Sequence, residues 1–419
     1  MAPLLFRQGY RSEILKAATG RSCPREQFGK SYCKERGVRN TVGPDLVEPA
    51  EVREYPKPER GMEMSMQQTT KKDDLIVIGG AGGFIGGSLT RYFHDRGFTR
   101  IRAIDKKPLP DWYQRVPGVE SLCMDLSERE NCVKACEDAV EVYNMAADMG
   151  GMGFIEKFRI ECLRSILINT NLIEAAYQAG VQRYFFSSSA CAYNTELQKD
   201  PHCRALKESD AYPAMAERGY GWEKLISEMF CQEYWAERGL KTFIARFHNV
   251  YGPNGTWDGG REKAPAAICR KVIEAKDTGK NEIVVWGDGT QTRSFMYIDD
   301  CTKGIDMIAH CEDLIATPIN LGSNELISVN ELVSMAEEIG GVKLQRKYDL
   351  TAPKGVAGRN SDNTMIKSIL NWEPSTPFRE GLAKTYAWIE QQYQDRKAGK
   401  VTVRENYLAA GPHAHTAGH

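Results

Sequence analysis

The strongest constraint on the fold is a set of glycines spaced three apart that directly follows an apolar segment. Residues 75–78 lead into Gly80, Gly83 and Gly86, and an amphipathic stretch opens at Phe84 and Ile85, between the last two glycines. In a strand-turn-helix unit such glycines permit a tight turn, a close backbone approach to a pyrophosphate, and close packing of helix on strand. Free amides at the helix start then face the phosphates. The pattern predicts a dinucleotide site, although a flexible surface loop is an alternative.

The next apolar segment distinguishes between the two nicotinamide cofactors. Residues 101–104 end in Asp105, where a second strand would present a carboxylate to the adenosine ribose hydroxyls. This charge would repel the extra phosphate of NADP, so the sequence favours NAD. Asp125 and Leu126 follow a further strand-like segment and are expected to contact the adenine. Asp125 could equally cap the helix that begins near Ser127.

Composition argues against several other classes of partner. The formal net charge of -1 gives no global attraction for nucleic acid or an anionic membrane. No apolar run is long enough to cross a bilayer. The twelve cysteines lack paired CxxC spacing, so we expect neither a metal site nor a disulfide framework. We therefore expect a cytoplasmic protein that acts on a small molecule.

The chain divides into four regions by pattern. Residues 1–70 are basic and lack periodicity, which favours a poorly ordered extension over an organelle transit peptide because Glu13, Glu26 and Glu35 interrupt the basic run. Residues 71–255 are expected to form an NAD-binding domain. Residues 256–395 are expected to form a smaller, mostly helical substrate lobe, with some strands returning to the main sheet. Residues 396–419 have the composition of a tail.

Alternation of apolar runs with amphipathic stretches predicts an α/β fold with a doubly wound parallel (Rossmann) sheet. Strands are expected at 75–78, 101–104, 140–143, 184–187 and 243–247, with helices clearest at 169–179 and 220–238. In the second region the sequence predicts strand-like pieces at 283–286 and 295–298. The helix 378–392 is amphipathic and is expected to pack back on the lobe.

Tyr220 and Lys224 lie one turn apart on one face of the predicted helix 220–238. We expect the lysine cation to lower the pKa of the phenol, so that the phenolate can take a proton from a sugar hydroxyl. A bare YxxxK pair occurs by chance on many surface helices. The pair is stronger evidence for a catalytic site here, because it follows a dinucleotide fingerprint and the run Ser187 to Ser189 at a predicted strand end.

Together these features resemble the extended short-chain dehydrogenase/reductase superfamily. Further motifs narrow the resemblance to the GDP-mannose 3,5-epimerase family, and they lie at 146–153, 188–191, 246–253, 259–265 and 286–295. The resemblance spans residues 75–392. Asn194 departs from it, because that family usually has proline after the preceding tyrosine.

The resemblance implies an NAD-dependent inversion of C3 and C5 of GDP-mannose. Oxidation at C4 creates a ketone that acidifies the hydrogens on both neighbouring carbons, and NADH finally reduces C4 again. Ser189, Tyr220 and Lys224 would serve the oxidation, with Cys191 as the base and Lys263 as the acid of the inversion. Without the resemblance, a buried structural thiol and a solvated lysine would be the commoner interpretations.

Substrate contacts are expected from a further group of residues that the motifs contain or flank. Arg293 and Arg359 suit a nucleotide diphosphate, because guanidinium groups pair with phosphate oxygens bidentately, although either could form a surface ion pair. The remaining candidates are Gly150, Ser189, Asn249, Glu262, Lys263, Lys271 and Gln291. By analogy with the superfamily, we expect a homodimer formed through two helices that flank the sheet.

Two other functions remain open. A related nucleotide-sugar 4-epimerase, dehydratase or decarboxylase would use Tyr220 and NAD without needing Cys191 and Lys263. A noncatalytic NAD-sensing module is the second alternative, although the retention of Ser189, Tyr220 and Lys224 argues against it.

Overall fold

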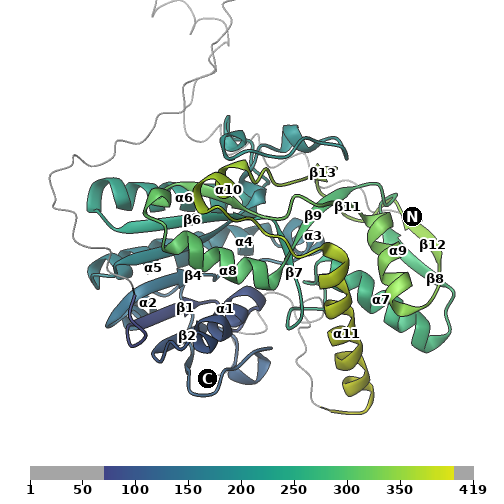
Figure 1. The fold of residues 1–419 in the computed structure, drawn as a ribbon, viewed down its shortest axis with the longest axis horizontal. Coiled ribbons are helices and arrows are strands. Elements are labelled where there is room, and N and C mark those ends of the chain that lie inside the picture. The colour runs from purple at the N-terminus through teal and green to yellow at the C-terminus, as the bar shows by residue number, and fades with distance from the viewer. Residues whose placement is uncertain (1–69, 401–419) are drawn as a thin grey trace, which may run out of the picture. The chain divides into compact units, whose positions relative to one another are not determined.

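The computed structural model describes residues 70–400, and a seven-stranded parallel sheet lies at its centre (Figure 1). The strand order is β10-β6-β5-β4-β1-β2-β3. The strands are β1 (Leu75–Gly79), β2 (Ile101–Asp105), β3 (Glu120–Cys123), β4 (Ala139–Asn144), β5 (Arg183–Ser189), β6 (Lys241–Phe247) and β10 (Pro318–Leu321). Strand order reverses between β1 and β4, which leaves a crevice at their carboxyl ends. The expected doubly wound sheet is confirmed.

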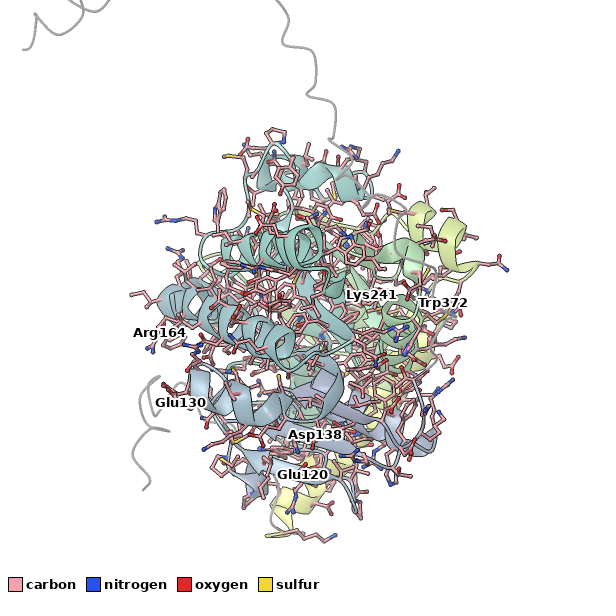
Figure 2. The ribbon with its side chains drawn as sticks, turned by 90° about the vertical axis from the view of Figure 1, so that its left-hand side faces the viewer. Glu120, Glu130, Asp138, Arg164, Lys241 and Trp372 are labelled. Carbon is pink, nitrogen blue, oxygen red and sulfur yellow. The ribbon has the colours of Figure 1, made fainter. Side chains whose placement is uncertain are left out.

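Helices cover both faces of this sheet because its strands carry apolar side chains on both sides. One face is covered by α2 (Arg129–Cys136), α5 (Ile166–Gln178) and α6 (Tyr220–Arg238), and the other by α1 (Phe84–Asp95) and α8 (Ile298–Ala309). The short helices α3 (Met152–Lys157) and α4 (Arg159–Arg164) precede α5. Figure 2 shows the layers, with Glu130 and Arg164 on one side, Glu120 and Asp138 between, and Trp372 on the other.

The second region contributes two smaller sheets as well as helices. One contains β9 (Thr292–Tyr297), β11 (Leu326–Ser328) and β13 (Gly358–Arg359), together with β7 (Asn249–Tyr251) from the end of the first region. The other pairs β8 (Glu282–Trp286) with β12 (Gln345–Asp349). Its helices are α7 (Ala264–Thr278), α9 (Val329–Gly340), α10 (Thr364–Leu370) and α11 (Phe378–Lys397). One strand of this region, β10, lies in the main sheet beside β6. The division at residue 255 stays a prediction.

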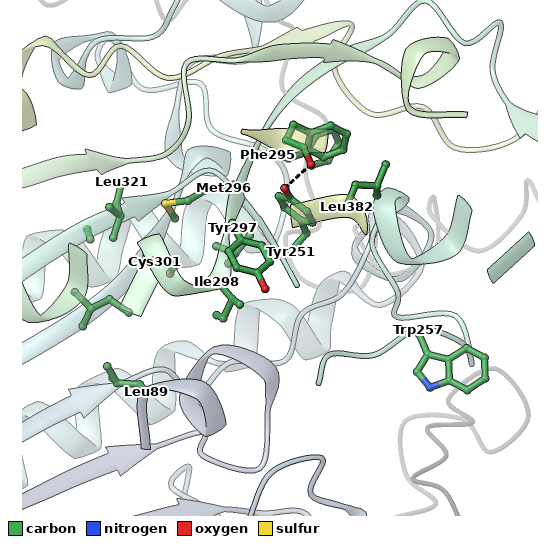
Figure 3. Close-up of a cluster of buried hydrophobic side chains, with 14 of the residues drawn as sticks. Leu89, Tyr251, Trp257, Phe295, Met296, Tyr297, Ile298, Cys301, Leu321 and Leu382 are labelled. Carbon is green, nitrogen blue, oxygen red and sulfur yellow. Dashed lines mark hydrogen bonds between the residues drawn. The ribbon is translucent and has the colours of Figure 1, made fainter. Parts of the chain in front are cut away.

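A buried cluster joins the second region to α1 and α8, and Figure 3 shows its side chains. Tyr251 of β7 donates its hydroxyl hydrogen to the carbonyl oxygen of Phe378 at 2.9 Å, which ties the start of α11 to the small sheet. Leu382, one turn further on, is fully buried in the same cluster. The predicted packing of the closing helix on the lobe is confirmed.

The five strands and two helices expected in the first region are confirmed, and α6 has the predicted bounds. The segment before Asp125 that has a strand-like pattern forms β3, whereas the sequence does not predict β7, β10, β11, β12 and β13. The extension up to residue 69 and the tail beyond residue 400 lie outside the described residues. Among the residues that are described, no helix is both long enough and apolar enough to span a bilayer.

Leu382→Ala is predicted to lower the free energy of unfolding by about 2 to 5 kcal/mol, because it leaves a cavity in the cluster that anchors α11. Urea denaturation followed by circular dichroism measures the change. Leu350, which is 64% exposed, supplies the control. Leu350→Ala should stay within about 0.5 kcal/mol of the parent. Equal stability of both variants would contradict the packing described for α11.

Candidate active site

The glycine turn after β1 forms one end of the candidate site. Gly80 has a φ of +79°, and a Cβ there would lie 2.8 Å from the backbone of Met145 and Ala146. A Cβ on Gly86 would lie 2.3 Å from the carbonyl oxygen of Gly80, so α1 can begin this close to the turn only with glycine. Gly83, the N-cap of α1, lines the pocket and has no side chain to cap the first amides of the helix.

A continuous pocket runs along the carboxyl ends of the sheet from this turn. Thirteen of the residues singled out from the sequence line it, namely Gly80, Gly83, Phe84, Ile85, Gly86, Asp105, Asp125, Leu126, Gly150, Ser189, Tyr220, Lys224 and Lys263. It therefore reaches from the predicted cofactor turn to the predicted catalytic helix. Seven predicted residues do not line it: Cys191, Asn249, Glu262, Lys271, Gln291, Arg293 and Arg359.

Asp105 and Asp125 mark the end of the pocket expected to hold the adenosine. Burial raises the pKa of Asp105, although Lys107 counteracts this through its charge and its amide, which donates to Oδ1 at 3.0 Å. Asp125 Oδ1 accepts a hydrogen bond from the amide of Ser127 at 2.9 Å. That bond forms a local turn rather than a helix cap, because α2 begins two residues later, at Arg129.

The serines at the end of β5 differ in how their hydroxyls are used. Ser187 donates to the carbonyl oxygen of Asn144 at 2.8 Å, and Ser188 donates to the carboxylate of Glu228. Ser189 Oγ accepts from the amide of Cys191 at 3.1 Å and also hydrogen bonds to Tyr220. Because the hydroxyl groups of Ser187 and Ser188 donate to other protein groups, Ser189 is the serine of this run that is placed to act on a ligand.

Tyr220 and Lys224 lie on the buried face of α6, as the spacing predicts. The expectation of a lowered tyrosine pKa is wrong for this structure: burial raises the pKa of Tyr220 well above its usual value, and Cys191 and Glu223 add to the shift. The physical reason lies in how the ammonium is placed. Lys224 Nζ lies 3.5 Å from the Glu223 carboxylate and 5.5 Å from the centroid of the Tyr220 ring.

Cys191 follows Ser189 in a short 3-10 turn and packs beside Tyr220. Its sulfur accepts a hydrogen bond from Arg359 Nη1 at 3.3 Å. Arg359 also forms an ion pair with Glu217, and all three side chains are shielded from solvent. Arg359 is therefore neither a surface ion pair nor a free phosphate ligand in this structure, because its guanidinium is engaged beside Cys191.

Lys263 approaches the pocket from the second region, at the residue that precedes α7. Burial lowers the pKa of its ammonium, while the neighbouring Cys191 raises it and Arg359 lowers it. The thiol and the ammonium are thus close enough to interact electrostatically although they come from different parts of the chain. A lysine with a lowered pKa gives up its proton more readily than an ordinary surface lysine.

The other predicted substrate residues lie behind or beside the pocket. Lys271 donates to the carbonyl oxygen of Val284 at 2.8 Å, and Gln291 donates to that of Trp286 at 2.7 Å. Asn249 donates to the carbonyl oxygen of Ser294 at 3.1 Å, joining β7 to β9.

Two of these residues shape loops around the site. Glu262 accepts from the amide of Gly260 at 2.6 Å and from Arg270 at 3.1 Å, which braces the loop that carries Lys263. Arg293 donates to carbonyl oxygens of the loop before β13, including that of Val356 at 2.6 Å. Burial and the Arg359 charge lower the pKa of Arg293 to about 10.

Sequence reasoning missed three charged residues at the site. Glu217 holds Arg359, and no motif points to it because it stands alone before α6. Asp148 bridges Lys106 at 2.7 Å and Arg261 at 3.3 Å, across the mouth of the pocket. Asp148 lies in the motif at 146–153 and Arg261 in the motif at 259–265, so these motifs were the sequence signal that could have identified both residues.

Comparisons with known proteins agree with this geometry. The profile of the NAD dependent epimerase/dehydratase family matches residues 76–322. A GDP-mannose 3,5-epimerase of Arabidopsis thaliana is 41% identical over 344 residues, which cover 80% of this chain and 88% of that protein. GDP-mannose 3,5-epimerase 1 of Oryza sativa subsp. indica is 39% identical, with 81% and 88% covered. GDP-L-fucose synthase 1 of Arabidopsis thaliana is 27% identical, with 76% and 93% covered.

Solved structures show the same fold. The UDP-glucose 4-epimerase of Thermotoga maritima with UDP-glucose superposes with a TM-score of 0.66 at 21% identity, covering 76% of this chain and 99% of that one. The UDP-glucose 4-epimerase of Thermus thermophilus in complex with NAD gives 0.64 at 20% identity, with 75% and 98% covered.

Gly86→Ala is predicted to remove bound dinucleotide, because its Cβ would force α1 away from the Gly80 turn. The nucleotide released from purified, heat-denatured protein measures the loss. Gly341→Ala, at a C-cap with open space around it, controls for the general cost of replacing a glycine. This control should lose about 1 kcal/mol of stability and keep its nucleotide. Full nucleotide content in Gly86→Ala would contradict the assigned turn.

Proposed function

Since the chain belongs to the NAD dependent epimerase/dehydratase family, we propose that it is an NAD-dependent epimerase inverting C3 and C5 of GDP-mannose through a 4-keto sugar. Its products are GDP-L-galactose and GDP-L-gulose. One observation carries this proposal beyond the family: the redox pair Tyr220 and Lys224 and the acid candidate Lys263 line one pocket, and the thiol of Cys191 packs beside Tyr220.

NAD suits this pocket. The Gly80 turn leaves a cradle that a side chain would fill, and the carboxylate of Asp105 lines the same pocket, where it would meet the adenosine ribose. We propose that Gly83, Phe84, Ile85 and Gly86 hold the pyrophosphate, and that Asp125 and Leu126 contact the adenine. When bound, NAD takes a hydride from C4 of the sugar and returns it at the end of the cycle.

In the proposed mechanism, Tyr220 moves the proton of the sugar O4. In its ionised form Tyr220 accepts this proton while C4 is oxidised, and the phenol so formed returns the proton when the ketone is reduced. Ser189 orients O4, and Lys224 lines the same pocket one turn further along α6. Burial of all three side chains excludes water, so the ketone is not lost to hydration before the inversions are complete.

The inversions need a base and an acid on opposite faces of the sugar. We propose that Cys191 removes the proton from C5 and from C3, and that Lys263 delivers a proton from the other face. Their positions support this division, because Cys191 comes from the end of β5 and Lys263 from the start of α7. The lowered pKa of Lys263 fits an acid, since it weakens the hold of the nitrogen on its proton.

The remaining predicted residues are proposed to bind the nucleotide sugar. The loop with Gly150 would cover the hexose, and Asn249 and Glu262 would brace the hexose site. Arg359 would meet the diphosphate only by leaving one of its present partners. Lys271 and Gln291 lie beside Trp286, on whose half-exposed ring the nucleotide base could stack. Arg293 contacts the loop before β13.

A homodimer is also proposed, formed through the helical face of the main domain. Apolar side chains are exposed on α4, α5 and α6, which pack side by side. They are Ile160, which is 72% exposed, and Leu163, Leu167, Tyr177, Trp222 and Met229. An exposed apolar face of this kind is typical of a subunit interface.

We propose that the enzyme acts in the cytoplasm. All ten cysteines of the described residues are free thiols, including the exposed Cys123. Such thiols persist in a reducing compartment and oxidise readily in a secretory one. A GDP-sugar substrate is consistent with that compartment.

Incubation with GDP-mannose in heavy water tests the function. The protein is predicted to incorporate deuterium at both C3 and C5, with product sugars identified by NMR. Cys191→Ser and Lys263→Met should reduce uptake on the order of a hundredfold or more, because each removes a proton-transfer group. Both variants should still oxidise C4, seen as absorbance of the reduced cofactor. Tyr220→Phe should lose both signals.

Two results would contradict this assignment. Exchange that survives Cys191→Ser would favour a related 4-epimerase or dehydratase, which needs no thiol. Bound NAD without turnover of any sugar nucleotide would favour the noncatalytic module.

Met229→Glu is predicted to shift the protein from dimer to monomer, because it places a charge in the exposed face of α6. Sedimentation velocity measures the change. Leu350→Glu, an equal change at an exposed position on a different surface, should leave the dimer intact. A parent protein that sediments as a monomer would overturn the interface.

A further inference from the structure

A buried arginine connects Cys191 to a carboxylate that has no role in the proposed reaction. Arg359 Nη1 lies 3.3 Å from Cys191 Sγ, and its Nε donates to Gln198 Oε1 at 2.6 Å. Its Nη2 donates to the carboxylate of Glu217. The guanidinium thus uses all of its nitrogens at once, with the sulfur on one side and the carboxylate on the other.

The backbone fixes Glu217 beside Cys191 independently of the arginine. The amide of Glu217 donates to the carbonyl oxygen of Cys191 at 3.1 Å. A Cβ on Gly221 would lie 2.2 Å from the same carbonyl oxygen and 3.1 Å from Glu217 Cβ. The segment before α6 therefore packs directly on the turn that carries the thiol, and the two side chains cannot drift apart.

Five charged or titratable groups face this sulfur from the surrounding elements. They are Glu217 and Tyr220 at the start of α6, Lys263 before α7, Arg293 of β9 and Arg359 of β13. Glu217 is the carboxylate among them. Burial raises the pKa of Cys191 and the Glu217 charge raises it further, while Arg359 and the hydrogen bond with Ser189 lower it.

The carboxylate itself stays ionised. Burial alone would raise the pKa of Glu217, but the Arg359 charge and the hydrogen bonds from Arg359 and Cys191 hold it below its usual value. The thiol therefore lies beside a permanent anion. An anion beside a thiol disfavours the thiolate by Coulomb repulsion, and in a buried site this repulsion is poorly screened.

We propose that Glu217 is a positioning residue that acts through Cys191: its carboxylate holds the Arg359 guanidinium against the sulfur, and its charge keeps the sulfur protonated. This rests on the role of base proposed for Cys191. The two members of the ion pair have opposite effects on the ionisation of the same sulfur, because Arg359 favours the thiolate and Glu217 favours the thiol. Glu217 thereby sets the pH above which the base is available, and the thiolate that does form is the stronger base.

The pH dependence of Cys191 alkylation tests the proposal without any turnover. The full chain is treated with iodoacetamide across a pH series, and mass spectrometry follows the peptide that contains Cys191. Glu217→Gln is expected to lower the midpoint by about one pH unit, a tenfold gain in thiolate at a given pH. Glu217→Asp keeps the charge and should stay near the parent. Glu338→Gln removes an exposed, arginine-paired carboxylate and should change nothing.

An unchanged or raised midpoint in Glu217→Gln would overturn the proposal. Equal shifts of the midpoint in Glu217→Gln and Glu217→Asp would also overturn it. They would show that Glu217 acts by anchoring the loop and not through its charge. If Glu217→Gln does not fold, Arg359→Gln supplies the reciprocal test. It should raise the midpoint, and a lowered midpoint would refute the opposing signs.

A second readout separates this proposal from the function on which it rests. The pH profile of deuterium uptake at C3 and C5 should move down in Glu217→Gln together with the alkylation midpoint. If Cys191→Ser leaves uptake intact, the base role fails while the alkylation shift still reports on Glu217. If alkylation shifts but the uptake profile does not, the action of Glu217 through Cys191 on the reaction is refuted.

Discussion

The site depends on close backbone contacts at the carboxyl edge of the main sheet, where three glycines leave no room for a Cβ. Gly80 lies against the segment after β4, Gly86 lies against Gly80, and Gly221 lies against the carbonyl oxygen of Cys191. Because of these contacts, the ends of β1, β4 and β5 and the start of α6 lie around one crevice. Larger side chains there would separate the cofactor turn from the catalytic helix.

Buried charge gives this crevice its chemistry. Tyr220 and Cys191 are buried and Lys263 is half-buried, so desolvation favours the neutral form of each: the pKa of the phenol and of the thiol rises, and that of the ammonium falls. The Arg359 and Glu217 pair then adjusts one of them, the thiol, without reaching the cofactor turn.

Much of this arrangement could be predicted from the sequence, because its signals are local. The glycine spacing, the Tyr220 and Lys224 pair and the apolar runs each lie within one element, and periodicity reveals them. Several short strands of the second region are not predicted because, at two to five residues, they carry little periodicity. The motif resemblance supplied Cys191 and Lys263, whose chemistry no local pattern shows.

Long-range electrostatics could not be predicted in the same way. Lys224 pairs with Glu223 and so does not lower the pKa of Tyr220, and Arg359 is held by Glu217 from a distant segment. Both outcomes depend on which charges the fold brings together. The structure of the protein with NAD and GDP-mannose bound tests the central claim most directly. We predict Cys191 Sγ and Lys263 Nζ on opposite faces of the hexose, beside C3 and C5. Both groups on one face, or either one turned away from the sugar, would contradict it.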